Sequence, residues 1–93
     1  MFKTNSYFGG TVMSLAFHPA EGRATVGVMA PGEYEFGTET VELMTVVAGR
    51  MTVQLPDAAE WREHLPGETF TVAAGKKFRL RVPEESAYLC RYR

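Results

Sequence analysis

Residues 45–55 read TVVAGRMTVQL, and this stretch decides the fold class. Two apolar runs of alternating character stand on either side of Ala48-Gly49-Arg50. Alternation with a period of two is typical of β-strands, because successive side chains point to opposite faces of a sheet. A glycine between two such runs is typical of a β-hairpin turn. The stretch therefore predicts two antiparallel strands joined at Gly49.

The same pattern recurs along the rest of the chain, and no stretch shows the spacing of an amphipathic helix. Turns that contain Pro or Gly separate the runs, and no helix longer than one turn is expected. Short strands at regular spacing predict an all-β sandwich or barrel. The candidate strands are residues 11–17, 23–30, 43–48, 51–55, 68–72, 77–82 and 87–91, with a further short one near Trp61.

Length and composition predict one small domain over residues 1–93, with 45% apolar and 23% charged residues. No apolar run reaches the roughly 20 residues of a membrane span, and the first ten residues lack the pattern of a secretory signal. We therefore expect a cytoplasmic protein with no membrane partner. The single cysteine, Cys90, can form neither an internal disulfide nor a thiolate metal cluster.

The formal net charge of −1 argues against nucleic-acid binding, which needs an excess of Lys and Arg. One basic cluster stands out, at Lys76, Lys77, Arg79 and Arg81. Two interpretations are open for it, the solvent-exposed face of a strand and an anion site, and the first is the simpler.

Two spacings in the chain resemble the two motifs of the cupin family. Glu42 and Gly49 match the first motif, and Gly67 and Gly75 match the second. The family's metal-binding histidines would fall on Phe36, Thr38 and Phe78, none of which is a ligand for a transition metal. His18 stands beside Pro19 and His64 two residues before Pro66, both away from these positions. The resemblance implies a jelly-roll-like, cupin-type β-barrel, and the substitutions predict that it holds no metal.

Aromatic side chains replace the metal ligands at the mouth of the expected barrel. Tyr34, Phe36 and Thr38 share one strand face, because residues two apart project together. Phe36 and Phe78 can flank a flat ligand, with Glu42 and Thr38 on its hydroxyl groups, although packing in the core is the alternative for each Phe. An inward carboxylate is costly unless it is paired. Glu42 therefore predicts either an arginine partner, Arg23 or Arg91, or a ligand that donates hydrogen bonds.

A closer resemblance extends over nearly the whole chain. It rests on several segments, among them NSYFGG (5–10), GRATVGVM (22–29), GEYEF (32–36), ELMTV (42–46), LPD (55–57) and YLCRY (88–92). These segments resemble the small pyrimidine/purine nucleoside phosphorylases, which are single-domain cupins of about this length. The resemblance implies cleavage of purine and pyrimidine nucleosides by inorganic phosphate, giving a free base and ribose 1-phosphate. Nucleosides and phosphate are then the small-molecule partners.

Residues in these segments suit that chemistry. The planar guanidinium gives bidentate hydrogen bonds to phosphate, which indicates Arg23 and Arg91 as phosphate ligands, with Arg91 and Glu42 in the catalytic set. Glu42 and Thr38 are the candidate ribose contacts. An aromatic slot accepts any base, because every base has a π-face. No cofactor is expected beyond the phosphate co-substrate. The candidate stacking residues are Tyr34, Phe36 and Phe78, and the candidate proton donors for the departing base are Tyr7 and Tyr92.

Each arginine also has an alternative to phosphate binding. Ala24, Val26 and Val28 form the more apolar face of their strand, and Arg23 points to solvent if that face lines the barrel. Arg91 can equally form a surface salt bridge.

Two other functional classes fit the same sequence. One is a non-catalytic cupin that only binds a small molecule. The other is a structural dimerisation module, in which Phe2, Tyr7, Phe8 and Phe17 cover a partner's sheet. Because 93 residues bury a limited core, we expect a homodimer whichever of the three functions is correct.

Overall fold

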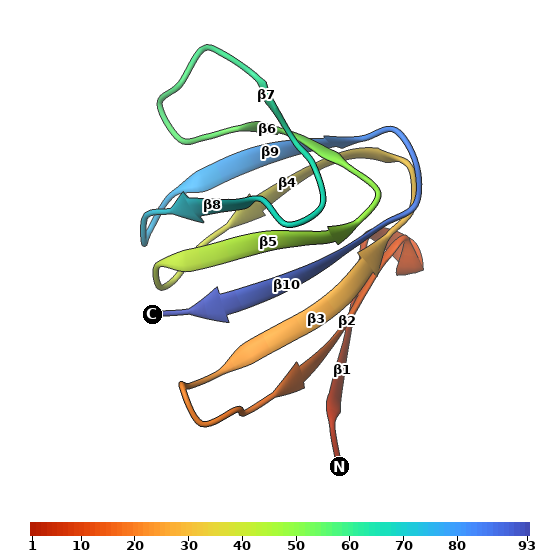
Figure 1. Cartoon of the computed structure of the whole chain (residues 1–93), viewed down its shortest axis with the longest axis vertical. Helices are drawn as coiled ribbons and strands as arrows, with labels where there is room; N and C mark the ends of the chain where they lie inside the picture. The colour runs from red at the N-terminus through yellow and green to blue at the C-terminus, as the bar shows by residue number, and fades with distance from the viewer.

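The computed structural model describes residues 1–93 and is built almost entirely from strands (Figure 1). One 3-10 turn is the only helical element, so no helix in the structure is long enough to cross a membrane. The all-β prediction is confirmed. The elements are β1 (Lys3–Tyr7), η1 (Phe8–Gly10), β2 (Val12–Phe17), β3 (Ala24–Met29), β4 (Gly32–Gly37), β5 (Glu42–Ala48), β6 (Met51–Gln54), β7 (Arg62–His64), β8 (Thr69–Val72), β9 (Lys77–Val82) and β10 (Ser86–Tyr92).

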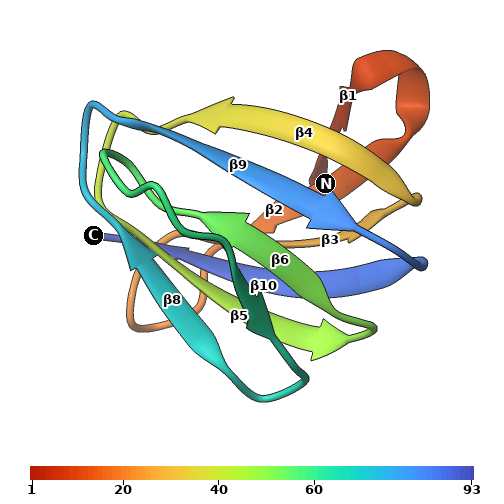
Figure 2. The ribbon, with the colours of Figure 1, turned by 90° about the horizontal axis from the view of Figure 1, so that it is seen from above.

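The strands form two sheets that lie face to face (Figure 2). The larger has the order β1-β2-β3-β10-β5-β8 and the smaller the order β4-β9-β6-β7, and the pairings in both are antiparallel. The expected barrel is therefore an open sandwich of two sheets in the jelly-roll style, because no ladder of hydrogen bonds closes one sheet onto the other.

The predicted hairpin at Gly49 is wrong, since β5 and β6 belong to different sheets. Ser86, the first residue of β10, explains the crossing. Its hydroxyl accepts a hydrogen bond from the Arg50 N–H at 3.1 Å and donates to nearby carbonyls, among them that of Arg50. Gly49 has a φ of 77°, and a Cβ there would lie 2.7 Å from the Glu85 carbonyl oxygen. The glycine thus serves a sharp corner between two layers.

Two strands are missing from the candidate ranges, β1 and β4, although Tyr34 and Phe36 of β4 were expected to share a strand face. In β4, Glu33 and Glu35 alternate with aromatic residues, and this face carries ion pairs to Arg81 at 3.5 Å and Arg79 at 3.2 Å on β9. All four charged residues are exposed. The arginines of the basic cluster therefore lie on the solvated outer face of the smaller sheet, as the simpler of its two interpretations predicted.

The core lies between the two sheets. It is built from the inward faces of both, which alternate with exposed positions along β2, β3 and β9 and with half-buried positions along β10. The buried residues of this cluster are Val12, Met29, Tyr34, Met44, Val46, Met51, Val53, Phe70, Val72, Phe78, Leu80, Val82, Tyr88 and Cys90.

Candidate functional site

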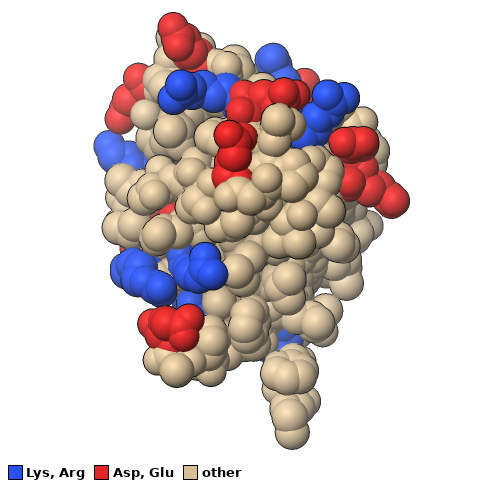
Figure 3. Space-filling view, viewed as in Figure 1, with Lys and Arg blue, Asp and Glu red and all other residues tan.

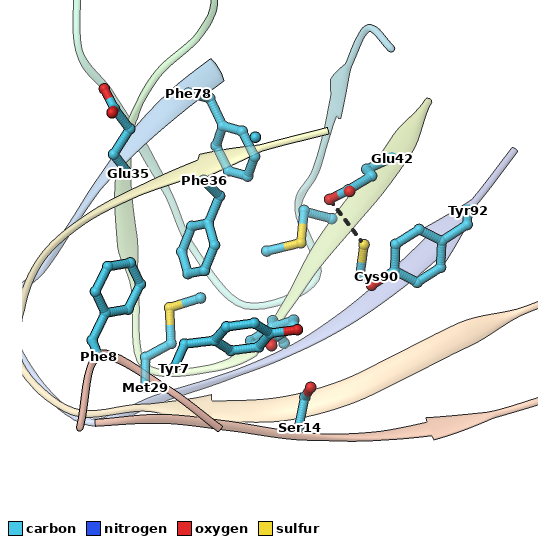
Figure 4. Close-up of a pocket in the computed structure, with 13 residues that line it drawn as sticks. Tyr7, Phe8, Ser14, Met29, Glu35, Phe36, Glu42, Phe78, Cys90 and Tyr92 are labelled. Carbon is cyan, nitrogen blue, oxygen red and sulfur yellow. Dashed lines mark hydrogen bonds between the residues drawn. The ribbon is translucent and has the colours of Figure 1, made fainter. Parts of the chain in front are cut away.

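A cavity of about 330 Å³ opens between the sheets where β1 and η1 approach β4 (Figure 4). Its volume lies in the range of small-molecule sites. Aromatic rings and two methionines supply most of its wall, and a few polar groups interrupt it. The lining residues are Tyr7, Phe8, Ser14, Met29, Glu35, Phe36, Gly37, Glu42, Met44, Phe78, Tyr88, Cys90 and Tyr92.

A second, more polar hollow continues from the first, because Tyr7, Gly37, Glu42 and Tyr92 line both. It carries two cations and two carboxylates and is bordered by β1, β3 and the segment after β4. Its remaining lining residues are Lys3, Asn5, Ala16, Arg23, Thr25, Glu39 and Thr40. The site thus has an aromatic end and a polar end, with Glu42 at the junction.

Glu42 begins β5 and is only partly buried, and it points toward the thiol of Cys90 on β10 (Figure 4). The Cys90 thiol donates a hydrogen bond to Oε1 of Glu42 at 3.5 Å. Burial raises the pKa of Glu42 above its usual value of 4.5, while the Cys90 hydrogen bond and the nearby positive charge of Arg23 oppose that shift. The sequence predicted an arginine partner or a ligand for Glu42; Arg23 acts on it through its charge, but no salt bridge joins the two residues.

Arg23 lies just before β3 and lines the polar hollow. Its guanidinium carbon lies 4.3 Å from the centroid of the Tyr92 ring, a cation–π contact. Tyr92 pairs with Glu42 in the sheet, and its N–H donates to the Arg23 carbonyl at 3.2 Å. Arg23, Tyr92 and Glu42 therefore form one row across β3, β10 and β5.

This row decides between the two orientations that were open for Arg23. Thr25 and Met29 are buried against the cavity side, and Val26 and Val28 are exposed on the outer face of the larger sheet. The more apolar face of β3 thus points away from the cavity. Arg23 shares the inward side with Thr25.

Arg91 lies on the opposite side of the sheet. Tyr88, Cys90 and Tyr92 line the cavity, and because side chains alternate along a strand, Leu89 and Arg91 project from the outer face. The structure therefore does not bring Arg91 to Glu42 or to Arg23.

Thr38 and Tyr34 also lie outside the cavity lining. The Thr38 hydroxyl donates to the Ala73 carbonyl at 2.7 Å and accepts from the Lys76 N–H at 3.1 Å, so it holds the turn before β9. The Tyr34 hydroxyl donates to the Ala30 carbonyl at 2.6 Å. The Thr38 hydroxyl is therefore engaged by the backbone and lines neither hollow. The Tyr34 ring is buried, lies 5.2 Å from the Phe8 ring between centroids and lines neither hollow, so it offers no open face to a base.

Phe36 and Phe78 both line the cavity, but they do not flank a slot. Their rings stack on each other with centroids 5.9 Å apart and a tilt of 30°. A flat ligand between two rings needs two contacts of about 3.5 Å, hence roughly 7 Å between the rings. A base can therefore stack on Phe36 only from the face that Phe78 leaves open.

The two candidate proton donors both line the junction of the hollows. Burial raises the pKa of Tyr92, so its hydroxyl keeps its proton at neutral pH, and this hydroxyl shares a hydrogen bond with Thr25 at 3.0 Å. The histidines lie elsewhere, and the His64 ring packs 4.9 Å from that of Phe70.

Sequence reasoning missed Cys90 as a neighbour of Glu42, and it also missed Ser14 and Tyr88 on the cavity floor. The signal was available for two of them, because Tyr88 and Cys90 alternate with Leu89 and Arg91 in the last strand. Burial raises the pKa of Cys90 to about 12, and the Glu42 charge adds to that effect. The thiol therefore acts as a protonated hydrogen-bond donor.

Comparison with known proteins agrees with this architecture. The family model described as "Pyrimidine/purine nucleoside phosphorylase" matches residues 2–92. The chain belongs to this family. A relative of that name from Pseudomonas fluorescens is 59% identical over 93 residues, which cover 100% of this chain and 99% of the relative.

Solved structures extend the comparison from sequence to fold. A Vibrio parahaemolyticus protein of this family's fold, described as of unknown function, has a TM-score of 0.96 and 45% identity and covers 100% of this chain and 99% of its own. A cupin-superfamily protein from Desulfitobacterium hafniense has a TM-score of 0.70 at 14% identity, over 95% of this chain and 79% of its own. The second likeness shows the fold alone. The predicted cupin fold is thereby confirmed.

Proposed function

We propose that the protein is a nucleoside phosphorylase that cleaves purine and pyrimidine nucleosides with inorganic phosphate. One observation carries the proposal: a partly buried carboxylate, Glu42, stands where an aromatic cavity meets a polar hollow that contains Arg23. A nucleoside is divided in the same way as the site. It has a flat base at one end, a hydroxylated sugar at the other, and the bond that breaks between them. The name of the family and of its relatives supports the same activity.

The two ends of the site suggest how the substrates lie. The base enters the aromatic cavity and stacks on Phe36, which accepts purines and pyrimidines alike. The ribose reaches Glu42, whose carboxylate accepts hydrogen bonds from its hydroxyls. Phosphate lies in the polar hollow beside Arg23, with Lys3 as a further cation of that hollow.

In the reaction a phosphate oxygen forms a bond to the anomeric carbon as the bond from that carbon to the base nitrogen breaks. The electron pair of the broken bond leaves with the base, which takes up a proton, and the sugar ring carries positive charge in the transition state. The ionised Glu42 stabilises that charge. Tyr7 and Tyr92 are the candidate donors of the proton.

We further propose that no metal or organic cofactor takes part. Phe36, Thr38 and Phe78 stand where the cupin motifs carry metal ligands, and none of the three supplies a donor for a transition metal. Positioning and electrostatics then supply the rate. Exhaustive chelation followed by assay tests this, and a loss of activity that Zn²⁺, Mn²⁺ or Fe²⁺ restores would contradict it.

We also propose a cytoplasmic homodimer. The sequence indicated an interface at the N-terminal aromatic residues, and Tyr7 and Phe8 also pack on Phe36 in the same chain. The outer face of the larger sheet offers another surface, a shallow apolar hollow over β2 and β3 whose walls include Met13, Leu15, Val26 and Val28. On the face shown in Figure 3, Lys and Arg side chains gather at the left, by the C-terminal end of β10, and the area to their right is almost free of charged side chains.

The decisive assay incubates purified protein with inosine or uridine, with and without phosphate, and measures free base and ribose 1-phosphate. Phosphorolysis predicts equal amounts of both products, and only when phosphate is present. Nucleoside binding with no product would instead support the non-catalytic binding cupin. Product formation that does not depend on phosphate would show hydrolysis and would overturn the phosphate site.

A further inference from the structure

The free face of Phe36 is already occupied within the chain. The Phe8 and Tyr7 rings meet the Phe36 ring nearly at right angles, with centroids 5.5 and 6.2 Å away. Figure 4 shows Phe36 between Phe78 on one side and this pair on the other. Because Phe78 fills the first side, a base that stacks on Phe36 must displace Phe8 or Tyr7.

The segment that carries these two rings is built differently from the rest of the wall. β1 lies at the edge of the larger sheet and pairs only with β2. Phe8, Gly9 and Gly10 then follow with φ values of 52°, 68° and 92°. A bulky residue at positive φ is a strained conformation, and such outliers cluster where a protein binds ligands or moves.

The exposed fractions of the side chains also distinguish Phe78 from Tyr7 and Phe8, which lie on the other side of Phe36. Phe78 is only 2% exposed, whereas Tyr7 and Phe8 are 44% and 51% exposed although both contact Phe36. Displacing Phe8 therefore breaks few buried contacts. Displacing Phe78 would open the core.

We propose that Tyr7 and Phe8 form a movable wall of the base site, and that Phe8 determines which bases the site favours. This inference rests on the proposed function. A base swings the Phe8 ring away from Phe36, stacks in its place and is then covered by the displaced ring. A pyrimidine, with one ring, depends on that cover for most of its second contact face. A purine, with two rings, keeps more of its contact with Phe36 when Phe8 is absent.

Isothermal titration calorimetry of inosine and uridine without phosphate tests the wall apart from the chemistry. Removing an aromatic ring that stacks on a base weakens binding roughly tenfold. We expect Phe8→Ala to raise the uridine Kd by about that factor and the inosine Kd by less, so that the ratio of the two changes at least about fivefold. Phe2→Ala is the matched control, because Phe2 is exposed and lines neither hollow.

Phe8→Leu is the second variant and keeps apolar bulk without the π-face; we expect it to lie between wild type and Phe8→Ala. A folded Phe8→Ala protein with both Kd values within twofold of wild type would contradict the proposal of a movable wall. Binding with the expected ratio but no phosphorolysis in wild type would overturn only the proposed function. Normal phosphorolysis in wild type, together with an unchanged ratio of the uridine and inosine Kd values in Phe8→Ala, would contradict only the proposal of a movable wall.

Discussion

The thiol of Cys90 donates a hydrogen bond to the carboxylate of Glu42 across the neighbouring strands β10 and β5, at 3.5 Å. This contact favours the ionised carboxylate, and so does the charge of Arg23, while burial favours the neutral acid. Burial is the largest of the three effects, so the pKa of Glu42 is raised. If Glu42 acts in its ionised form, as proposed above, the activity depends on how well its few polar neighbours keep it ionised.

The first prediction concerns this hydrogen bond. If catalysis needs ionised Glu42, kcat/KM falls as the pH drops through a pKa above 4.5. Cys90→Ala removes the donor and Cys90→Ser retains one, so we expect the acid limb of the Ala variant to lie about half a pH unit to one unit above that of the Ser variant. Measuring kcat/KM from pH 4 to 8 checks this. Identical limbs would show that the thiol does not act on Glu42.

The second prediction is that Glu42→Gln lowers turnover by about 10²–10³-fold, the scale of one preorganised electrostatic group. The same substitution should stabilise the fold at pH 7. The folded-state pKa of Glu42 is raised, so the unfolded chain ionises more readily, and the ionised carboxylate weakens the fold at pH 7.

We therefore expect Glu42→Gln to melt at a higher temperature than wild type at pH 7. The difference should disappear as the pH falls below about 4.5, because both states of the wild-type chain then hold the neutral acid. Calorimetry at pH 7 and pH 4 measures both values. A variant that keeps normal turnover but melts at a much lower temperature would make Glu42 a structural residue.

Much of this site could be predicted from alternation alone, and β10 shows how. Once Glu42 and Phe36 are placed inside, the period of two puts Tyr88, Cys90 and Tyr92 on one face and Arg91 on the other. The neighbouring strand β3 misleads, because Val26 and Val28 form an apolar face that is exposed. Alternation identifies the two faces, but which one is inside depends on the opposite sheet.

The crossing at Gly49 shows a different limit. Local pattern predicts a turn there correctly, and it cannot tell a hairpin from a corner between sheets. The corner depends on Ser86, whose hydroxyl bonds the Arg50 backbone from 36 residues away. Such a contact leaves no periodic trace in the sequence.

The third prediction separates the two arginines. Arg23 lines the polar hollow and Arg91 projects from the outer face, so only Arg23 is placed to bind phosphate beside Glu42. Arg23→Lys keeps the charge and loses the bidentate fork, which should raise the KM for phosphate with little change in the KM for nucleoside. Arg91→Lys should leave both constants near wild type.

Steady-state kinetics with phosphate and nucleoside varied separately supply the comparison. A larger rise in the phosphate KM for Arg91→Lys than for Arg23→Lys would restore the role that the sequence suggested for Arg91. It would also mean that the phosphate site lies outside this cavity.

The fourth prediction concerns the corner between the sheets. A Cβ at position 49 would meet the Ser86 hydroxyl and the Glu85 carbonyl, and the φ of 77° is unfavourable for alanine. We expect Gly49→Ala to lower the free energy of unfolding by more than about 1 kcal/mol. Gly67→Ala is the control, because its φ of 91° is also positive but nothing lies within 4 Å of its Cβ. Urea denaturation of both variants separates the contact from the backbone strain, and equal losses would show that the contact contributes nothing.

The fifth prediction concerns association through the outer face of the larger sheet. Val26 and Val28 are 42% and 57% exposed there, beside Met13 and Leu15 on the neighbouring strand. An apolar surface of this kind on a small domain is typical of an interface between subunits.

Light scattering should give a mass near twice 10.4 kDa, and Val28→Glu should reduce it toward one chain, because an unpaired carboxylate is costly at a buried interface. Thr71→Glu is the matched control on β8, at the far edge of the same sheet, and should remain dimeric. A wild-type protein that stays monomeric at micromolar concentration would refute the dimer, and a dimer that survives Val28→Glu would move the interface to another face.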